Sequence, residues 1–288
     1  MKPLSIPVHV VGPGSQPEEE ALQYLDMPHE MDTFHMPLVP DRVEAEALSE
    51  ARDVLQEFHE LLEPWDPALG LPGPKLSLVG LSPAALVVVN QMLGDGEVSI
   101  KLEGKRRAHI QESVFAGVWR VCELDAEDRL IGDWIEGAAI PAIVLEMAHA
   151  AAAPVPAMVK LGENAMNSPA LLHEIREQVA NRKPRSPTRV INLTLFPLTP
   201  EDHRILEEAL PVGPVAIISR GFGNCRITST LARDVWRVQY FNTMNTLILN
   251  TLEIVDTPEV ALAASEDLAD SRERLAELIQ WMGESCTA

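Results

Sequence analysis

The 288-residue sequence predicts an α+β fold in which a β-α-β-β-β-β unit occurs twice, with antiparallel sheets covered by helices and an extended N-terminal arm. The first observation is an internal match. Residues 76–141 align with residues 193–258 without gaps, and 18 of 66 positions are identical, whereas unrelated segments match at about one position in 15 to 20. The second is the tetrapeptide Val-Trp-Arg-Val, found at 118–121 and 235–238. A duplicated unit is therefore the basis for assigning the elements.

Each unit begins with a short strand that leads into a helix. The stretches "KLSLVGLSP" (75–83) and "NLTLFPLTP" (192–200) predict this pair of elements. Ser82 and Thr199 are suited to the N-cap, and the proline after each suits the first helical position. In the second unit Asp202 completes a pattern typical of a capping box.

Four strands follow the helix, and they are clearest in the second unit. A glycine before each unit's next strand predicts strands at 97–102 and 214–219. Three more are expected at 224–231, 234–241 and 246–255, joined by turns at "GFG" and "NTMN".

The repeated tetrapeptide predicts which side of the sheet is buried. Trp236, Val238 and Tyr240 alternate with Arg237 and Gln239, so one face of the strand is apolar. We expect both tryptophans of the tetrapeptides to anchor the core, under helices that cover one side of the sheet. Each tetrapeptide arginine is expected to pair with an acid on the next strand, Arg120 with Glu136 and Arg237 with Glu253.

Amphipathic helices are expected outside the two units, at 43–62, 168–182 and 259–282. The predicted organisation is an extended acidic arm, two repeat units and a helical C-terminal segment, with bounds 1–42, 43–160, 161–258 and 259–288.

Charge limits the class of partner. The sequence has 43 acidic and 23 basic residues and a formal net charge of -20, which argues against binding to nucleic acid or to an anionic membrane surface. The most apolar run, "AAIPAIVLEMAHAAAAPVPAMV", is too interrupted for membrane insertion. Three cysteines and no pattern of a signal peptide predict a cytoplasmic protein.

The N-terminal arm carries a group of methionines and histidines. Residues 1–66 hold 15 acidic and 3 basic residues, and residues 1–42 show no helical or strand period. Methionine and histidine can bind copper, nickel or zinc, but methionines more often serve as adaptable contacts to a partner. We therefore interpret the following residues as candidate partner-binding residues, with the two histidines also weak candidates for a metal: Met27, His29, Met31, His35 and Met36.

Cys225 is the candidate functional thiol. It follows the Gly-Phe-Gly turn, and its counterpart in the first unit is Ala108, so the duplication does not require it. It could act as a nucleophile or a metal ligand, but no CxxC spacing surrounds it, and buried cysteines commonly act as small apolar residues. The neighbouring candidate partner-binding residues are Gly221, Phe222, Gly223, Asn224 and Arg226.

Catalytic motifs are absent from the sequence. There is no G-x-S-x-G, H-E-x-x-H or P-loop, and "GFGNCR" lacks the third glycine of a dinucleotide fingerprint. Glu146 and His149 have a spacing found in di-iron bundles, but no matching carboxylates accompany them, so we assign them to the surface. The sequence predicts neither an enzyme nor a cofactor.

Long stretches of the chain resemble the HupH/HyaF family of hydrogenase expression proteins. The resemblance is densest in "GNCRITST" (223–230) and "VWRVQYFNTMNTLILNTLE" (235–253), and it extends to "NLTLFPLTPEDHRILEEAL" (192–210) and to the N-terminal "GPGSQPEEEALQYLDMPHEMDTFHMPLVP" (12–40). The resemblance implies a bacterial accessory protein for maturation of an uptake [NiFe]-hydrogenase. Its expected partners are a hydrogenase structural subunit or other maturation proteins, and it assigns no catalytic residue.

Two alternatives remain open. One is a transferase, or a protein that handles nickel, iron or an iron–sulfur cluster through transient contact with Cys225 and the arm. The other is a small-ligand pocket between the two units. The sequence does not distinguish a small-subunit client from a large-subunit client.

Overall fold

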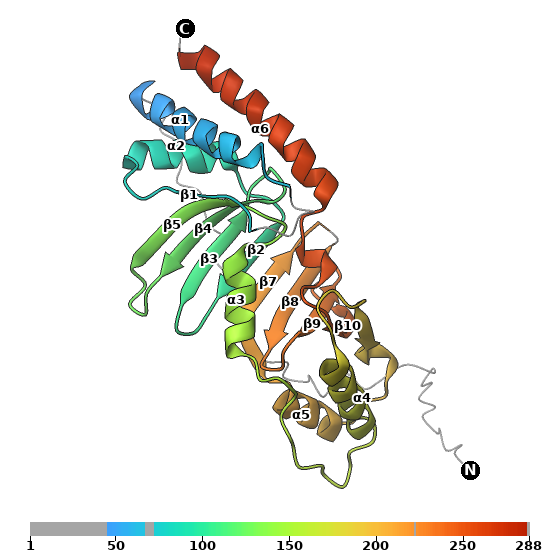
Figure 1. Cartoon of the computed structure of the whole chain (residues 1–288). Helices are drawn as coiled ribbons and strands as arrows, with labels where there is room; N and C mark the ends of the chain where they lie inside the picture. Colours follow the sequence, from blue (N-terminus) through green and yellow to red (C-terminus); the bar gives the residue numbers. More distant parts are fainter. Residues whose placement is uncertain (1–44, 67–71, 222, 287–288) are drawn as a thin grey trace, which may run out of the picture. The chain divides into compact units, whose positions relative to one another are not determined.

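The computed structural model describes residues 45–66, 72–221 and 223–286, and Figure 1 shows the arrangement of their elements. The described helices are α1 (Ala45–Leu62), α2 (Pro83–Leu93), α3 (Ala142–Ala151), α4 (Ser168–Asn181), α5 (Pro200–Ala209) and α6 (Ser265–Cys286). The described strands are β1 (Lys75–Ser77), β2 (Val98–Leu102), β3 (Arg107–Glu112), β4 (Val118–Leu124), β5 (Leu130–Gly137), β6 (Arg189–Asn192), β7 (Val212–Ser219), β8 (Asn224–Thr230), β9 (Val235–Phe241) and β10 (Leu247–Ile254). The α+β class is confirmed.

All ten described strands form one antiparallel sheet, in the order β1-β5-β4-β3-β2-β7-β8-β9-β10-β6. The prediction of two separate sheets is therefore wrong. The two halves join where β2 pairs with β7, and there Ile100 lies opposite Ile217, its own counterpart in the 117-residue alignment. Pairing these two strands satisfies backbone groups that would otherwise be left at two exposed sheet edges.

The two halves share their order of elements. β1-α2-β2-β3-β4-β5 in the first half is matched by β6-α5-β7-β8-β9-β10 in the second. Trp119 pairs with Glu136 across β4 and β5, and Trp236 pairs with Glu253 across β9 and β10. This equivalence agrees with the internal match, and the duplication itself stays a prediction.

The first strand of the second half departs from the expected pattern. Residues "LTL" form a short 3-10 helix, η2 (Leu193–Leu195), rather than a strand. The side chain of Asn192 accepts a hydrogen bond from the Thr194 N–H at 3.0 Å, which turns the chain directly after β6. The strand prediction for this stretch is wrong because a side-chain cap at Asn192 competes with the sheet ladder.

Helices cover both faces of the sheet, so the expectation of one covered side is also wrong. α3 packs on the face that carries both tetrapeptide tryptophans, against β7. The opposite face carries two separate apolar clusters. One lies under α1, α2 and α6 at the β4–β5 end, and the other lies under α4 and α5 at the β9–β10 end (Figure 1).

The tetrapeptide tryptophans are core anchors, as predicted. Trp119 and Trp236 are buried, and the indole N–H of each donates to a backbone carbonyl at the end of the neighbouring strand. The acceptors are Ala138 O at 2.8 Å and Val255 O at 3.2 Å, which are themselves equivalent positions. A buried indole N–H is thereby satisfied in both halves.

The predicted arginine pairs are wrong. Arg120 forms a buried ion pair with Asp133, with Nη2 donating to Oδ2 at 2.7 Å. Glu136 lies on the Trp119 face of the sheet, where it accepts from Lys75 Nζ at 3.3 Å. Because neighbouring residues of a strand point to opposite faces, an acid opposite Trp119 cannot share a face with Arg120. The same alternation separates Arg237 from Glu253.

The last helix begins later than the sequence pattern suggests. Residues Glu259–Ala261 form a short 3-10 turn, η3, and α6 starts at Ser265. Ala263 lies between η3 and α6, and its N–H donates to Ala139 O at 3.0 Å. This hydrogen bond attaches the connecting segment to the residues that follow β5. In the described part of the chain, no helix is both long and apolar enough to cross a membrane.

Candidate functional site

Cys225 lies in the core, on the tryptophan face of β8. It sits opposite Tyr240 of β9, and the two side chains share a hydrogen bond. Burial raises the pKa of the Cys225 thiol to about 11 and that of Tyr240 to about 12. The thiol is therefore protonated at neutral pH, and this environment favours a packing role over a thiolate nucleophile. A functional role for Cys225 stays a prediction.

The glycine turn before Cys225 is present, but its residues do not converge with the thiol. Gly221 and Gly223 bridge one another across the turn, and Gly223 has a φ of 90°, which favours glycine. The Arg226 guanidinium lies 4.7 Å from the centre of the Phe241 ring. Arg226 and Cys225 are neighbours on one strand, so they point to opposite faces of the sheet. Asn224 is exposed.

Six candidate residues lie outside the described part of the chain: Met27, His29, Met31, His35, Met36 and Phe222. Their roles stay predictions. Glu146 contacts Arg106 at 3.5 Å, and His149 Nε2 contacts Asp234 Oδ1 at 3.1 Å, as expected for surface positions. Among the described side chains, no group of three or more His, Cys, Asp or Glu is arranged to hold a metal ion.

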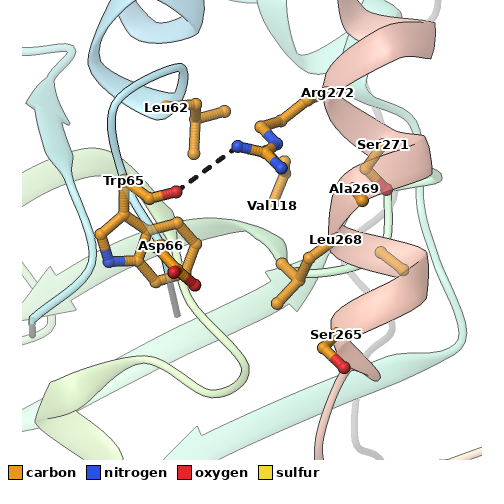
Figure 2. A pocket seen from close by; sticks show the side chains of 11 residues that line it. Leu62, Trp65, Asp66, Val118, Ser265, Leu268, Ala269, Ser271 and Arg272 are labelled. Atoms are coloured by element: carbon orange, nitrogen blue, oxygen red, sulfur yellow. Dashed lines mark hydrogen bonds between the residues drawn. The ribbon is translucent and has the colours of Figure 1, made fainter. Parts of the chain in front are cut away.

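The structure adds a cavity that sequence reasoning missed. It has a volume of about 140 Å³ and lies between the end of α1, the turn before β4 and the first turns of α6. Figure 2 shows Leu62, Trp65, Val118 and Leu268 around this space. Three of its lining residues are exposed, so the cavity reaches the surface: Asp66, Ser265 and Ala269.

Gly117 forms one wall of the cavity and makes the docking of α6 possible. It has a φ of 77°, and a Cβ there would lie 1.9 Å from Leu268 Cδ2. Arg272 of α6 donates to Trp65 O at 3.4 Å and to Glu63 O at 3.5 Å, which connects α6 to the end of α1 (Figure 2). The guanidinium is therefore occupied by backbone carbonyls.

In the second half, the positions equivalent to Gly117 and Trp65 carry an ion pair. Gly117 aligns with Asp234, and Trp65 aligns with Arg182 at the same 117-residue offset. Arg182 Nε lies 3.4 Å from Asp234 Oδ2, and Arg182 is nearly buried. The sequence signal for the cavity is therefore this difference between the halves. The first half has a glycine and a tryptophan where the second half has an aspartate and an arginine.

Comparison with known proteins identifies the family. The model of the HupH hydrogenase expression protein, C-terminal conserved region, matches residues 48–158 and 165–282. The chain belongs to the HupH family. The resemblance seen in the sequence is thus confirmed, and both halves of the sheet lie within the matched regions.

Relatives of the HupH family match almost the whole chain. It is 42% identical over 284 residues to the hydrogenase expression/formation protein HoxQ of Cupriavidus necator, covering 98% of this chain and 99% of that protein. It is 30% identical over 280 residues to the hydrogenase-1 operon protein HyaF of Escherichia coli, with 96% and 97% covered. A solved HupH structure from Thiobacillus denitrificans matches with a TM-score of 0.34 and 25% identity, over 38% of this chain and 92% of that one.

Proposed function

We propose that the protein is a non-catalytic accessory factor in the maturation of an uptake [NiFe]-hydrogenase. In this role it binds a hydrogenase structural subunit or another maturation protein. The observation that carries the proposal is family membership along nearly the full chain, with relatives named as hydrogenase expression/formation proteins.

The surface chemistry supports a binding role. The chain has a net charge of -20 and no motif for nucleotide, metal-hydrolase or acyl-transfer chemistry. Charge complementarity between two proteins promotes selection of the partner and speeds their encounter. An acidic accessory protein therefore suits a client that presents basic segments during assembly.

Deletion of the gene in its bacterial host tests the maturation role. We expect hydrogenase activity to fall and an unprocessed or unassembled hydrogenase subunit to accumulate. Purification of the tagged chain from cells that express the hydrogenase operon is expected to retain a structural subunit or a maturation protein. Unchanged hydrogenase activity and assembly in the deletion strain would reject the proposal.

The rival function is metal or iron–sulfur handling, or group transfer, through Cys225 and the arm. The buried, protonated state of Cys225 makes it the weaker proposal. Titration of the purified full chain with Ni²⁺, Fe²⁺ or Cu⁺ separates the two. Stoichiometric uptake that is lost in Cys225→Ser would favour the rival function, and an unaltered metal content in this variant would count against it.

A further inference from the structure

We propose that the cavity between α1 and α6 is a docking site for a lysine- or arginine-rich polypeptide segment that inserts one apolar side chain. This inference rests on the proposed accessory function and deepens it, because it assigns a place and a chemistry to client binding. The partner is identified by two features of the site, the size of the cavity and the charge of the helices beside it.

The cavity has the size and lining for a single apolar side chain. Its volume is about 140 Å³, and Leu62, Val118 and Leu268 contribute aliphatic surface beside the Trp65 ring (Figure 2). Apolar cavities of about 150 Å³ bind a molecule of the size of benzene. A leucine or phenylalanine side chain is therefore a suitable occupant, whereas a nucleotide or a large cofactor is not.

The two helices beside the cavity are strongly acidic. Helices α1 and α6 pack against one another, and together they carry eleven acidic residues, three arginines and no lysine. Asp66 itself lines the cavity, and the exposed acids directly adjacent to a lining residue in the sequence are Glu63, Glu266, Asp267, Asp270 and Glu273. A segment with positive charges on both sides of its apolar residue matches this rim, and an acidic segment would be repelled.

The one arginine that lines the cavity does not reverse this preference. Arg272 is held by two backbone carbonyls, Glu63 O and Trp65 O. An anionic ligand would have to compete with those contacts and with the acidic rim. The geometry therefore favours a cationic segment over a carboxylate or phosphate ligand.

Several residues that line the cavity differ from those at the equivalent positions of the second half. In the second half the equivalents of Gly117 and Trp65 are Asp234 and Arg182, which form an ion pair. Helix α6 also packs on α1 of the first half. Two halves with the same order of elements thus differ in the residues at this place.

A direct binding experiment uses the full chain and three labelled peptides. The peptides are Lys-Lys-Ser-Leu-Ser-Lys-Lys, the same sequence with glycine for leucine, and the same sequence with glutamate for every lysine. Fluorescence polarisation at low salt measures the dissociation constant of each. We expect the first peptide to bind at least ten-fold more tightly than either of the others.

Matched variants locate the binding site. Ala269→Trp places a large side chain at an exposed lining position, and Ala276→Trp places it on the same helix face about 10 Å further along α6. We expect at least a ten-fold loss of peptide affinity in the first variant and less than a two-fold change in the second. Circular dichroism of both variants establishes that α6 still folds.

Charge variants test the rim. The pair Glu266→Lys and Glu273→Lys changes the net charge by the same amount as the pair Glu163→Lys and Glu177→Lys, which lies in and before α4. Only the first pair is expected to weaken binding of the lysine peptide. An equal loss in both pairs would show non-specific attraction and overturn the proposal, as would a wild-type chain that binds none of the peptides.

The same variants separate this inference from the proposed function. If the wild-type chain retains a hydrogenase partner from cells and Ala269→Trp retains it equally well, the docking site is wrong and the accessory function stands. If the deletion strain matures its hydrogenase normally, the accessory function fails whatever the peptides do.

Discussion

Glu112, at the end of β3, is a buried carboxyl beside the wall of the cavity. Its Oε1 accepts the Gly117 N–H at 3.1 Å. Burial and, to a smaller extent, the nearby carboxylates of Glu97 and Asp267 raise its pKa to about 6, although hydrogen bonds from the Gly117 and Val98 amides lower it. At neutral pH the folded protein therefore contains an ionised carboxylate in a buried environment that favours its protonated form.

The pH dependence of Glu112→Gln follows from this raised pKa. Below the unfolded value of about 4.5 both states are protonated, and Glu112 carries no penalty. As the pH rises from about 4.5 to the folded value of about 6, the carboxyl ionises in the unfolded state before it does so in the folded state. The free energy of unfolding therefore falls over this range, and the loss is complete above the folded pKa. Glu112→Gln is expected to raise the free energy of unfolding by roughly 1–2 kcal/mol at pH 7.5 and to leave it nearly unchanged at pH 4.5.

Urea unfolding of both proteins at pH 4.5, 6 and 7.5 measures this difference. Glu163→Gln is the matched control, because it removes one carboxylate at an exposed position in the second half, before α4. A stability difference for Glu112→Gln that does not vary with pH would contradict the assignment.

The buried tryptophans are the second feature at the scale of single residues. Trp119→Ala removes a fully buried indole and is expected to cost about 3–5 kcal/mol. Trp119→Phe keeps most of the ring but leaves Ala138 O without its donor, at a cost of about 1–3 kcal/mol. Trp281→Ala, at a position with 54% exposure, serves as the control and is expected to change stability little. Near-neutral Trp119→Ala with lost partner binding would instead mark the tetrapeptide as a binding site.

At the scale of elements, the N-termini of α2 and α5 are attached to neighbouring helices in two different ways. In the first half the Ser82 N-cap hydroxyl donates to Glu50 of α1 at 2.6 Å. In the second half Asp202, inside the predicted capping box, accepts from the amides of Met166, Asn167 and Ser168 at 2.9 to 3.0 Å, at the start of α4. In each half a carboxylate links two helices: half-buried Glu50 links α1 to α2, and buried Asp202 links α5 to α4.

Asp202→Asn tests the second device. Burial alone would raise the pKa of Asp202, but hydrogen bonds from Ser168 and Thr199 outweigh it and hold the pKa well below its usual range. A lowered folded pKa contributes stability above the unfolded value of about 3.9, and that stability is lost as the pH falls. Asp202→Asn is therefore expected to destabilise by about 1–3 kcal/mol at pH 7 and by less at pH 3.

Thermal unfolding at the two pH values measures this effect, with Glu208→Gln on the exposed side of α5 as the control. An equal destabilisation at pH 7 and pH 3 would mean that the charge of Asp202 is unimportant and that only its shape matters.

At the scale of the whole molecule, the β2–β7 pairing makes two halves into one sheet. The register is symmetric about the Ile100–Ile217 pair, with Val98 opposite Ser219 and Leu102 opposite Val215. The tryptophan face then forms one apolar cluster that includes residues of both halves. The opposite face is divided between two helical groups, and only the group with α6 contains the cavity.

The predicted N-terminal arm gives a prediction at the same scale. Deletion of residues 1–42 removes no described element, since α1 begins at Ala45. We expect the truncated chain to keep its circular dichroism spectrum and its unfolding temperature but to retain less hydrogenase partner on co-purification. A truncated chain that is unfolded, or that retains as much partner as the full chain, would reject a binding role for the arm.

Local patterns predicted most elements correctly. The alternation around Trp236, the caps at Ser82 and Thr199 and the glycine turn before β8 each depend on neighbours within a few residues of the chain. The failures arose where a local pattern competed with another interaction. Asn192 capped a turn in place of a strand, and Arg120 found Asp133 because the pleat places Glu136 on the other face.

The sequence by itself determined the class of fold, the order of elements, the buried tryptophans and the resemblance to the HupH family. The tertiary structure decided that the two halves share one sheet, that Cys225 is enclosed in its core and that α6 returns to pack on α1. The physical reason is the range of the interactions. Arg272 and Glu63 are separated by 209 positions, and no local periodicity encodes which distant apolar faces bury one another. The cavity exists only because that packing brings Trp65, Gly117 and Leu268 together.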